Sequence, residues 1–210
     1  MKFDILLAGV GGQGVLSMAA IIGRAALTEG LYAKQSEVHG MAQRGGAVQA
    51  HLRLADHPIE SDLIPLGTAD LILSLEPMES LRYLAYLAPE GTLVTAANPF
   101  VNIPDYPDVE KILARVRSLP RAIVVEAERL ALEAGDVQTL NTVMVGAVMH
   151  LLPLPAGSIE KAVSGAFARK GEFVLQANAA ALRAGREAAS LETAAHPATG
   201  PGPAAGGTRP

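Results

Sequence analysis

A cluster of glycines near the start of the chain has the spacing of a phosphate-binding loop. Gly9, Gly11 and Gly14 match the pattern G-x-G-x-x-G, and Gly12 adds a further glycine. An apolar run precedes the cluster and an apolar helical pattern follows it. A helix that begins at such a turn offers unpaired N–H groups and the positive end of its dipole to an anion. The cluster therefore predicts a site for a phosphate or pyrophosphate of a nucleotide-like ligand.

A second loop, residues 37–46, has a composition that also suits phosphate. It shows neither a helical nor a strand period, and it ends in Arg44, Gly45 and Gly46. An arginine offers bidentate hydrogen bonds, and the glycines allow the backbone to approach a ligand closely. Two such loops favour a ligand that carries phosphates in more than one place, such as coenzyme A.

Other interpretations of the same residues stay open. Glu37 follows the glycines by about 20 residues, where a nicotinamide dehydrogenase holds its ribose, so a free-standing NAD(P)-binding dehydrogenase is one alternative. Arg44 could form a salt bridge with Glu37 or Glu76, and Asn141 could be only a helix cap. The glycines could serve helix packing alone, in a structural or assembly subunit.

Strand and helix patterns alternate along most of the chain. This predicts an α/β fold: a Rossmann-like, mostly parallel sheet with helices on both faces. The expected strands are residues 3–8, 31–37, 47–54 (possibly antiparallel at an edge), 69–75, 92–96 and 122–125. The expected helices are residues 13–29, 77–87, 109–118, 126–134, 139–151, 158–168 and 171–189. Because ligands bind beyond the carboxyl ends of such strands, the two loops, the 75–77 corner and Asn98 are expected to converge on one crevice.

Local signals place several element ends. Gly30 is expected to end the first helix, Asp108 and Ser158 to cap later helices, and Pro89–Gly91 to form a turn. From about Ala188 the chain is rich in Ala, Pro and Gly. We therefore expect one domain over residues 1–187 and a disordered tail over residues 188–210.

Composition narrows the classes of function. The 210 residues carry a net charge of −4, which favours no nucleic-acid partner. The chain has no cysteine, so it can hold neither disulfides nor a cysteine-ligated iron–sulfur cluster. Its histidines lack the spacing of metal ligands, and no metal site is expected. Without an apolar run long enough for a bilayer and without a signal peptide pattern, a cytoplasmic location is expected.

Three motifs together resemble one family. They are residues 9–15 (G-V-G-G-Q-G-V), residues 37–46 (E-V-H-G-M-A-Q-R-G-G) and residues 141–147 (N-T-V-M-V-G-A). The combination resembles the gamma-type subunits of 2-oxoacid:ferredoxin oxidoreductases, which include the pyruvate/ketoisovalerate gamma subunits. The second motif has the form found in the beta subunits of the indolepyruvate:ferredoxin oxidoreductases. The Leu75-Glu76-Pro77 corner also fits the family pattern, and the resemblance covers about residues 1–187.

The resemblance implies a non-redox subunit of a heteromeric enzyme that is not active alone. The family oxidatively decarboxylates 2-oxoacids, forms the acyl-CoA and passes electrons to ferredoxin. The resemblance further implies that thiamine diphosphate and iron–sulfur clusters lie on a large partner subunit, and that coenzyme A is a co-substrate. The resemblance favours indolepyruvate or another aryl pyruvate as the substrate. It leaves open which 2-oxoacid the enzyme uses. The motif positions carried over as binding residues are Gly9, Gly11, Gly12, Gln13, Gly14, Glu37, His39, Gly40, Met41, Gln43, Arg44, Gly45, Gly46, Glu76 and Asn141.

Overall fold

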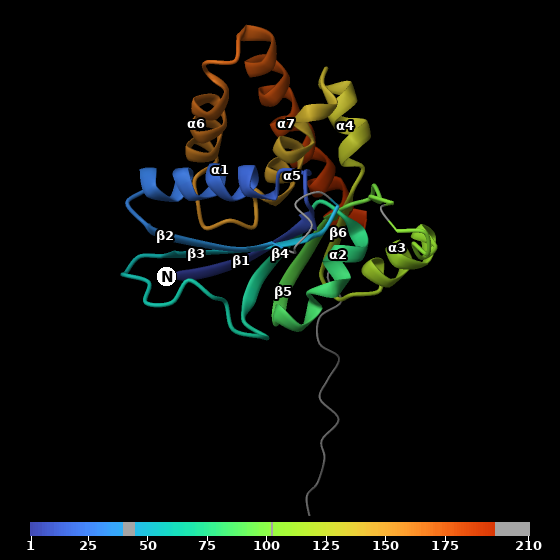
Figure 1. Ribbon diagram of the computed structural model, residues 1–210. Helices are drawn as coiled ribbons and strands as arrows, with labels where there is room; N and C mark the ends of the chain where they lie inside the picture. Colours follow the sequence, from blue (N-terminus) through green and yellow to red (C-terminus); the bar gives the residue numbers. More distant parts are fainter. Residues whose placement is uncertain (40–44, 102, 196–210) are drawn as a thin grey trace, which may run out of the picture.

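A computed structural model describes residues 1–39, 45–101 and 103–195 (Figure 1). The strands are β1 (Lys2–Val10), β2 (Tyr32–His39), β3 (Ala47–Ala55), β4 (Ala69–Ser74), β5 (Leu87–Ala96) and β6 (Ala122–Val125). The helices are α1 (Val15–Thr28), α2 (Pro77–Arg82), α3 (Val109–Arg117), α4 (Ala127–Glu133), α5 (Leu140–Val148), α6 (Ala156–Phe167) and α7 (Glu172–Ala195). Short 3₁₀ turns cover Leu84–Tyr86 and Val137–Thr139. None of the described helices is long and apolar enough to cross a membrane.

The six strands form one mixed sheet in the order β2-β3-β1-β4-β5-β6. β4 is parallel to β1 and β5, and β6 is parallel to β5, whereas β3 is antiparallel to both β1 and β2. Five strands therefore run in one direction and β3 runs against them, which confirms the α/β class. The expectation that residues 47–54 lie at an edge is wrong. β3 is interior and the edge strand is β2, because the reversed strand inserts between β1 and β2.

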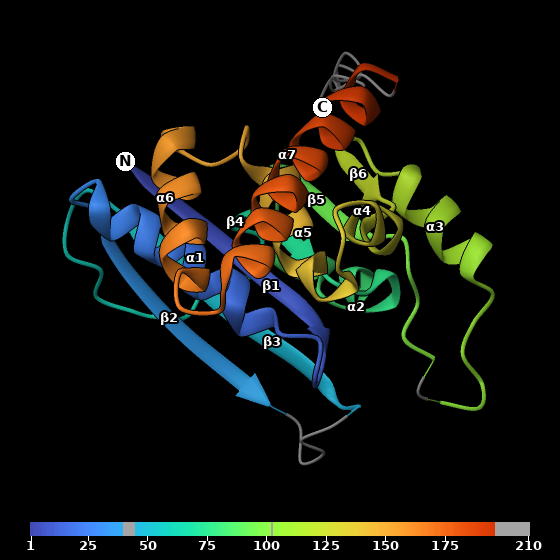
Figure 2. The ribbon, with the colours of Figure 1, turned by 90° about the horizontal axis from the view of Figure 1, so that it is seen from above.

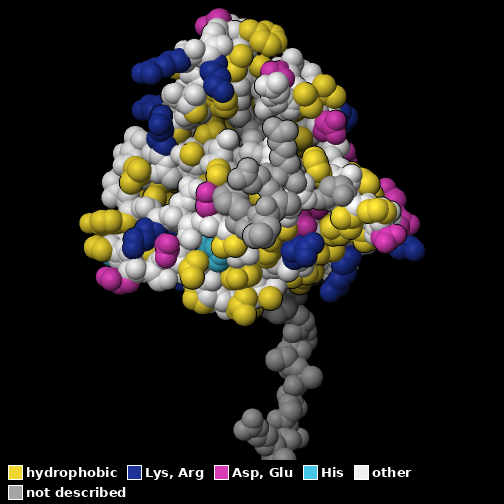
Figure 3. Space-filling view, viewed as in Figure 1, with side chains coloured by type: hydrophobic (Ala, Val, Ile, Leu, Met, Phe, Trp, Pro, Cys, Tyr) yellow, Lys and Arg dark blue, Asp and Glu magenta, His cyan; other side chains and the backbone are white. Residues whose placement is uncertain are grey.

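Helices cover both faces of the sheet (Figure 2). α1, α5, α6 and α7 lie over one face, and α2 and α3 lie against the other. Charged side chains of both signs lie on the outer surface in the same view (Figure 3). In β1, Ile5 and Leu7 point into the first layer and Leu6 points into the second. β4 alternates in the same way, with Leu71 and Leu73 opposite Ile72. Continuous apolar runs thus mark strands that are buried on both faces, as predicted.

α5 and α7 cross at very short range. A Cβ atom at Gly185 would lie 1.9 Å from the carbonyl oxygen of Val143, and one at Gly146 would lie 2.2 Å from that of Leu182. No side chain fits at either position, so the two glycines allow the helix backbones to touch. This contact fixes α5, and with it Asn141, against the rest of the C-terminal helices.

Two of the predicted element ends are confirmed. Gly30, with a φ of 75°, follows α1, and the Leu31 N–H donates to the Ala26 carbonyl as in a Schellman motif. The Asp108 carboxylate accepts from the Glu110 N–H at 3.0 Å and caps α3.

Other local predictions are wrong. Residues 89–91 continue β5 instead of turning, with a register shift at the start of β4, and Gly91 leaves room for the Ala69 carbonyl. α2 ends at Arg82 and does not reach residue 87. Ser158 lies inside α6, which begins after Pro155, and its hydroxyl contacts the Glu29 carboxylate.

The end of the chain also differs from expectation. α7 continues to Ala195, so residues 188–195 are helical. Ala189 is fully buried in the core, which explains why the helix passes residue 187. The predicted disorder of residues 196–210 falls outside the described part of the chain and stays a prediction.

Candidate functional site

The two glycine loops are hydrogen-bonded to each other. The Gly11 N–H donates to the Gly46 carbonyl at 2.8 Å, and the Gly45 N–H donates to the Gly11 carbonyl at 3.2 Å. These bonds continue the β1–β3 ladder one step beyond Val10 and Ala47. Figure 2 shows the loop ends and the start of α1 at the same edge of the sheet. The expected meeting of the two loops at the carboxyl end of β1 is confirmed for Gly45 and Gly46.

The N-terminus of α1 is open toward this edge. Gly14 is its N-cap residue in the left-handed conformation, with a φ of 82°. Among the described residues, no side chain forms a cap hydrogen bond there, and the first turn contains no acidic residue. Gly12 is exposed, and a Cβ atom built on it would meet no atom of the described residues within 4 Å. Unpaired N–H groups beside open space suit a bound anion.

Asn141 reaches this helix end from the far side of the sequence. Its Nδ2 donates to the Gly14 carbonyl at 3.1 Å, and the two residues are 127 positions apart. A Cβ atom at Gly14 would lie 2.4 Å from the same Nδ2, so only glycine fits here. Asn141 is the second residue of α5, whose N-cap is Thr139, so the interpretation of Asn141 as a helix cap is wrong.

Gln13 and Gly9 shape the loop from within. The Gln13 Oε1 accepts from the Val10 N–H at 2.7 Å, and its Nε2 donates to the Leu75 carbonyl at 3.3 Å. Gln13 therefore ties the loop to the end of β4. A Cβ atom at Gly9 would lie 2.8 Å from Val15 Cγ2, which makes Gly9 a packing residue beneath the loop.

Glu76 is fully buried and anchors a neighbouring loop. Its Oε2 accepts from the Glu79 N–H at 2.7 Å and caps α2, while its Oε1 accepts from the Phe100 N–H at 3.4 Å and from the Tyr106 hydroxyl. Burial and the Glu76 carboxylate raise the pKa of the Tyr106 phenol. Burial likewise raises the pKa of Glu79, against the lowering effect of Arg82. Glu76 thus anchors Phe100 and Tyr106 of the segment that follows β5, and direct contact of Glu76 with a ligand stays a prediction.

The position of Glu37 argues against a dinucleotide site of the dehydrogenase type. Glu37 is exposed near the end of β2, opposite Ala50 of β3. In the dinucleotide fold the acidic residue ends the strand next to the glycine-bearing strand. Here β3 separates β2 from β1, so Glu37 lies one strand farther from the glycine turn.

The structure describes only part of the second loop. His39 is the last residue of β2. Gly40, Met41, Gln43 and Arg44 lie outside the described residues, and their binding roles stay predictions. Sequence reasoning missed Tyr106, because an isolated tyrosine in a loop between prolines carries no periodic signal. The sequence did indicate Asn98, but its side chain contacts α4. The Asn98 Nδ2 donates to the Glu128 carboxylate, and the Asn98 Oδ1 accepts from the Glu128 N–H.

Comparison with known proteins identifies the class of protein to which this mixed sheet and its joined glycine loops belong. The chain belongs to the pyruvate ferredoxin/flavodoxin oxidoreductase family, whose model matches residues 4–188. Among its relatives is the indolepyruvate oxidoreductase subunit IorB of Archaeoglobus fulgidus, 39% identical over 173 residues, which are 78% of this chain and 85% of the relative. The IorB subunit of Pyrococcus horikoshii is 38% identical over 172 residues, or 77% and 85% of the two chains.

Solved structures show the same fold. The keto/oxoacid ferredoxin oxidoreductase gamma subunit of Geobacter sulfurreducens has a TM-score of 0.67 and 25% identity, and the match covers 90% of this chain and 99% of that one. A 2-oxoglutarate:ferredoxin oxidoreductase of Magnetococcus marinus has a TM-score of 0.72 and 22% identity. The match covers 93% of this chain but 32% of that one. This protein is thus a small subunit of a 2-oxoacid:ferredoxin oxidoreductase complex.

Proposed function

We propose that this chain forms one wall of the active-site cleft of an indolepyruvate or other aryl-pyruvate:ferredoxin oxidoreductase and binds coenzyme A there. The observation that carries the proposal is the junction of the two glycine loops at the uncapped N-terminus of α1. The names of the IorB relatives support the choice of substrate. The Magnetococcus marinus enzyme was solved with 2-oxoglutarate, coenzyme A and succinyl-CoA bound, which supports the choice of co-substrate.

The residues of the junction fit a phosphate of coenzyme A. The first-turn N–H groups of α1 supply donors and the positive end of a helix dipole. Gly12 leaves space for close approach, and Asn141 holds the helix end in place. Coenzyme A supplies the thiol that takes up the acyl group. The role of this chain is to bind and orient coenzyme A.

We propose that the redox chemistry resides on a large partner subunit. Without cysteine, this chain cannot ligate an iron–sulfur cluster through thiolates. The described residues also include no group of three His, Cys, Asp or Glu placed to hold a metal. We therefore assign thiamine diphosphate and the iron–sulfur clusters to the partner subunit, and with them the contact with ferredoxin. A cytoplasmic location of the complex is part of the same proposal.

Reconstitution tests this function. The full chain is mixed with the large subunit of its own organism, and viologen reduction is followed with indolepyruvate, with pyruvate and with 2-oxoglutarate. We expect CoA-dependent turnover only when both subunits are present, with indolepyruvate the best substrate. Full CoA-dependent activity of the large subunit alone would refute the proposed role. A preference for pyruvate or 2-oxoglutarate would refute the substrate assignment only.

A further inference from the structure

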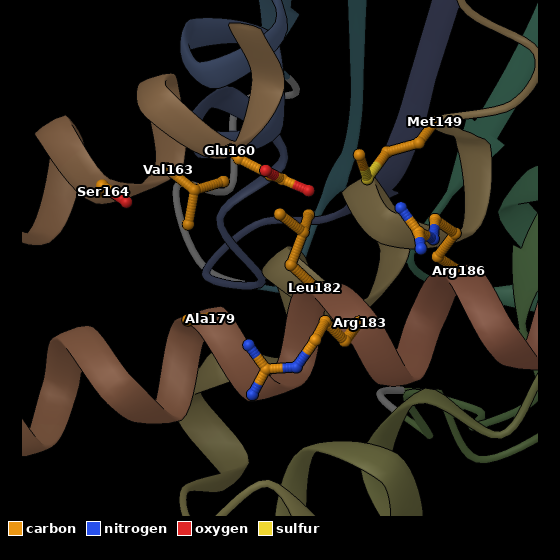
Figure 4. Close-up of a pocket in the computed structure, with 8 residues that line it drawn as sticks. All are labelled: Met149, Glu160, Val163, Ser164, Ala179, Leu182, Arg183 and Arg186. Carbon is orange, nitrogen blue, oxygen red and sulfur yellow. The ribbon is translucent and has the colours of Figure 1, made fainter. Parts of the chain in front are cut away.

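A cavity lies between α6 and α7, next to the end of α5, and none of its lining residues comes from the glycine loops (Figure 4). Its volume is about 260 Å³. Met149, Val163 and Leu182 form an apolar floor, and each of them is buried. Clefts for drug-sized ligands run from about 300 to 1,000 Å³. This cavity therefore suits a smaller molecule with an apolar part.

Opposite charges stand at the rim of the cavity. Glu160 projects from α6 and Arg186 from α7, and Figure 4 shows both side chains directed to the space above Leu182. Both residues are exposed, and neither side chain has an ion-pair partner within the described part of the chain. The Glu160 carboxylate and the Arg186 guanidinium therefore face the same cavity, and each is available to pair with a charged group of a ligand.

We propose that this cavity binds a zwitterion with an apolar side chain, namely a free α-amino acid. The ligand carboxylate pairs with the Arg186 guanidinium, which suits planar bidentate contact. The ligand ammonium pairs with the Glu160 carboxylate, whose oxygens point toward Arg186 in Figure 4. The apolar side chain lies on Leu182, Met149 and Val163.

The charges at the rim disfavour ligands with a single charge. A simple carboxylate would meet Arg186 but would be repelled by Glu160. A simple amine would meet Glu160 but would be repelled by Arg186 and Arg183, which also lines the cavity.

Calorimetric titration of the full chain tests the proposal with three probes of one shape. L-phenylalanine carries both charges, 3-phenylpropionate lacks the ammonium, and phenethylamine lacks the carboxylate. We expect one molecule of L-phenylalanine to bind per chain, and each analogue to bind at least about tenfold more weakly because one charge-assisted contact is lost. L-leucine and L-tryptophan report how large a side chain the floor accepts.

Two variants assign the contacts. Glu160→Gln should weaken phenylalanine binding about tenfold and leave or improve binding of 3-phenylpropionate. Arg186→Gln should weaken phenylalanine binding about as much and leave or improve binding of phenethylamine. Lys161→Gln and Glu187→Gln are the matched controls, because these exposed neighbours on the same helices do not line the cavity. Melting curves of all four variants show whether each remains folded.

Several outcomes would overturn the proposal. No heat from any of the amino acids at millimolar concentration would do so. Equal binding of all three phenyl probes would show a merely apolar hollow. Loss of binding in the control variants would show a nonspecific charge effect. None of these results bears on the CoA site, because reconstituted turnover is measured separately.

Discussion

The role of Asn141 gives the most direct test of an anion at the start of α1. We consider Asn141→Asp, which keeps the size of the side chain and replaces its donor with a negative oxygen. In the native protein the Nδ2 lies 3.1 Å from the Gly14 carbonyl. The variant therefore loses one neutral hydrogen bond and places a carboxylate beside the proposed phosphate position.

The effects on stability and on binding differ in size. Loss of the hydrogen bond costs about 0.5–1.5 kcal/mol, and a carboxylate near a helix N-terminus returns about 0.3–1 kcal/mol. The new carboxylate oxygen also faces the Gly14 carbonyl oxygen, and because two acceptors repel, we expect a net loss of about 1–2 kcal/mol in unfolding free energy. A phosphate about 5 Å from the new carboxylate is repelled by roughly 3 kcal/mol at an effective dielectric constant of about 20. Solvent and salt reduce this, so we expect CoA to bind about 10- to 100-fold more weakly.

The assay is the KM for CoA in the reconstituted complex at low and high salt, beside urea denaturation of the isolated chain. Asn141→Ala is the control, since it removes the hydrogen bond without adding charge and should change the KM only a few-fold. We expect the KM of Asn141→Asp to rise and to recover partly at high salt. If the two variants have the same KM for CoA, no phosphate lies at this helix end and the reasoning fails.

Two further predictions concern stability. Gly185→Ala should lower the unfolding free energy by about 1–3 kcal/mol or more, because the new Cβ would strike a carbonyl of α5, whereas Gly157→Ala has open space and should be neutral or slightly stabilising in the same urea titration. The pKa of Tyr106 is raised in the folded state by burial and by Glu76, so the native state favours the neutral phenol. The free energy of unfolding should therefore fall as pH rises above about 10, where the tyrosine of the unfolded chain ionises. Tyr106→Phe should weaken this pH dependence. It should not remove it, because burial also raises the pKa of Tyr83.

The sequence predicted most elements of the fold because burial leaves a local pattern. The runs that became β1 and β4 are apolar throughout since both faces of these strands are covered. β3 alternates because Leu52 and Leu54 face the core while Gln49 and Arg53 face the other side. The same alternation did not show where in the sheet the strand lies, because strand order depends on pairing partners far away in the chain.

Single glycines and turns were less predictable. Pro89-Glu90-Gly91 has the composition of a turn, yet the segment pairs with β4 and Gly91 lies against the Ala69 carbonyl. The alanine-rich end of α7 has the composition of a tail, yet Ala189 packs into the core. In both cases tertiary contacts outweigh local propensity.

The sequence by itself predicted the class of the protein and located its glycine loops, because these depend on residue type and short spacing. Tertiary structure alone decided how the loops act together. It joined Gly11 to Gly45 and Gly46, placed Asn141 on Gly14, and gave Glu76 a buried anchoring position. Such contacts join residues that are far apart in the chain, so no local pattern encodes them. They form only when the sheet and its two helical layers have assembled.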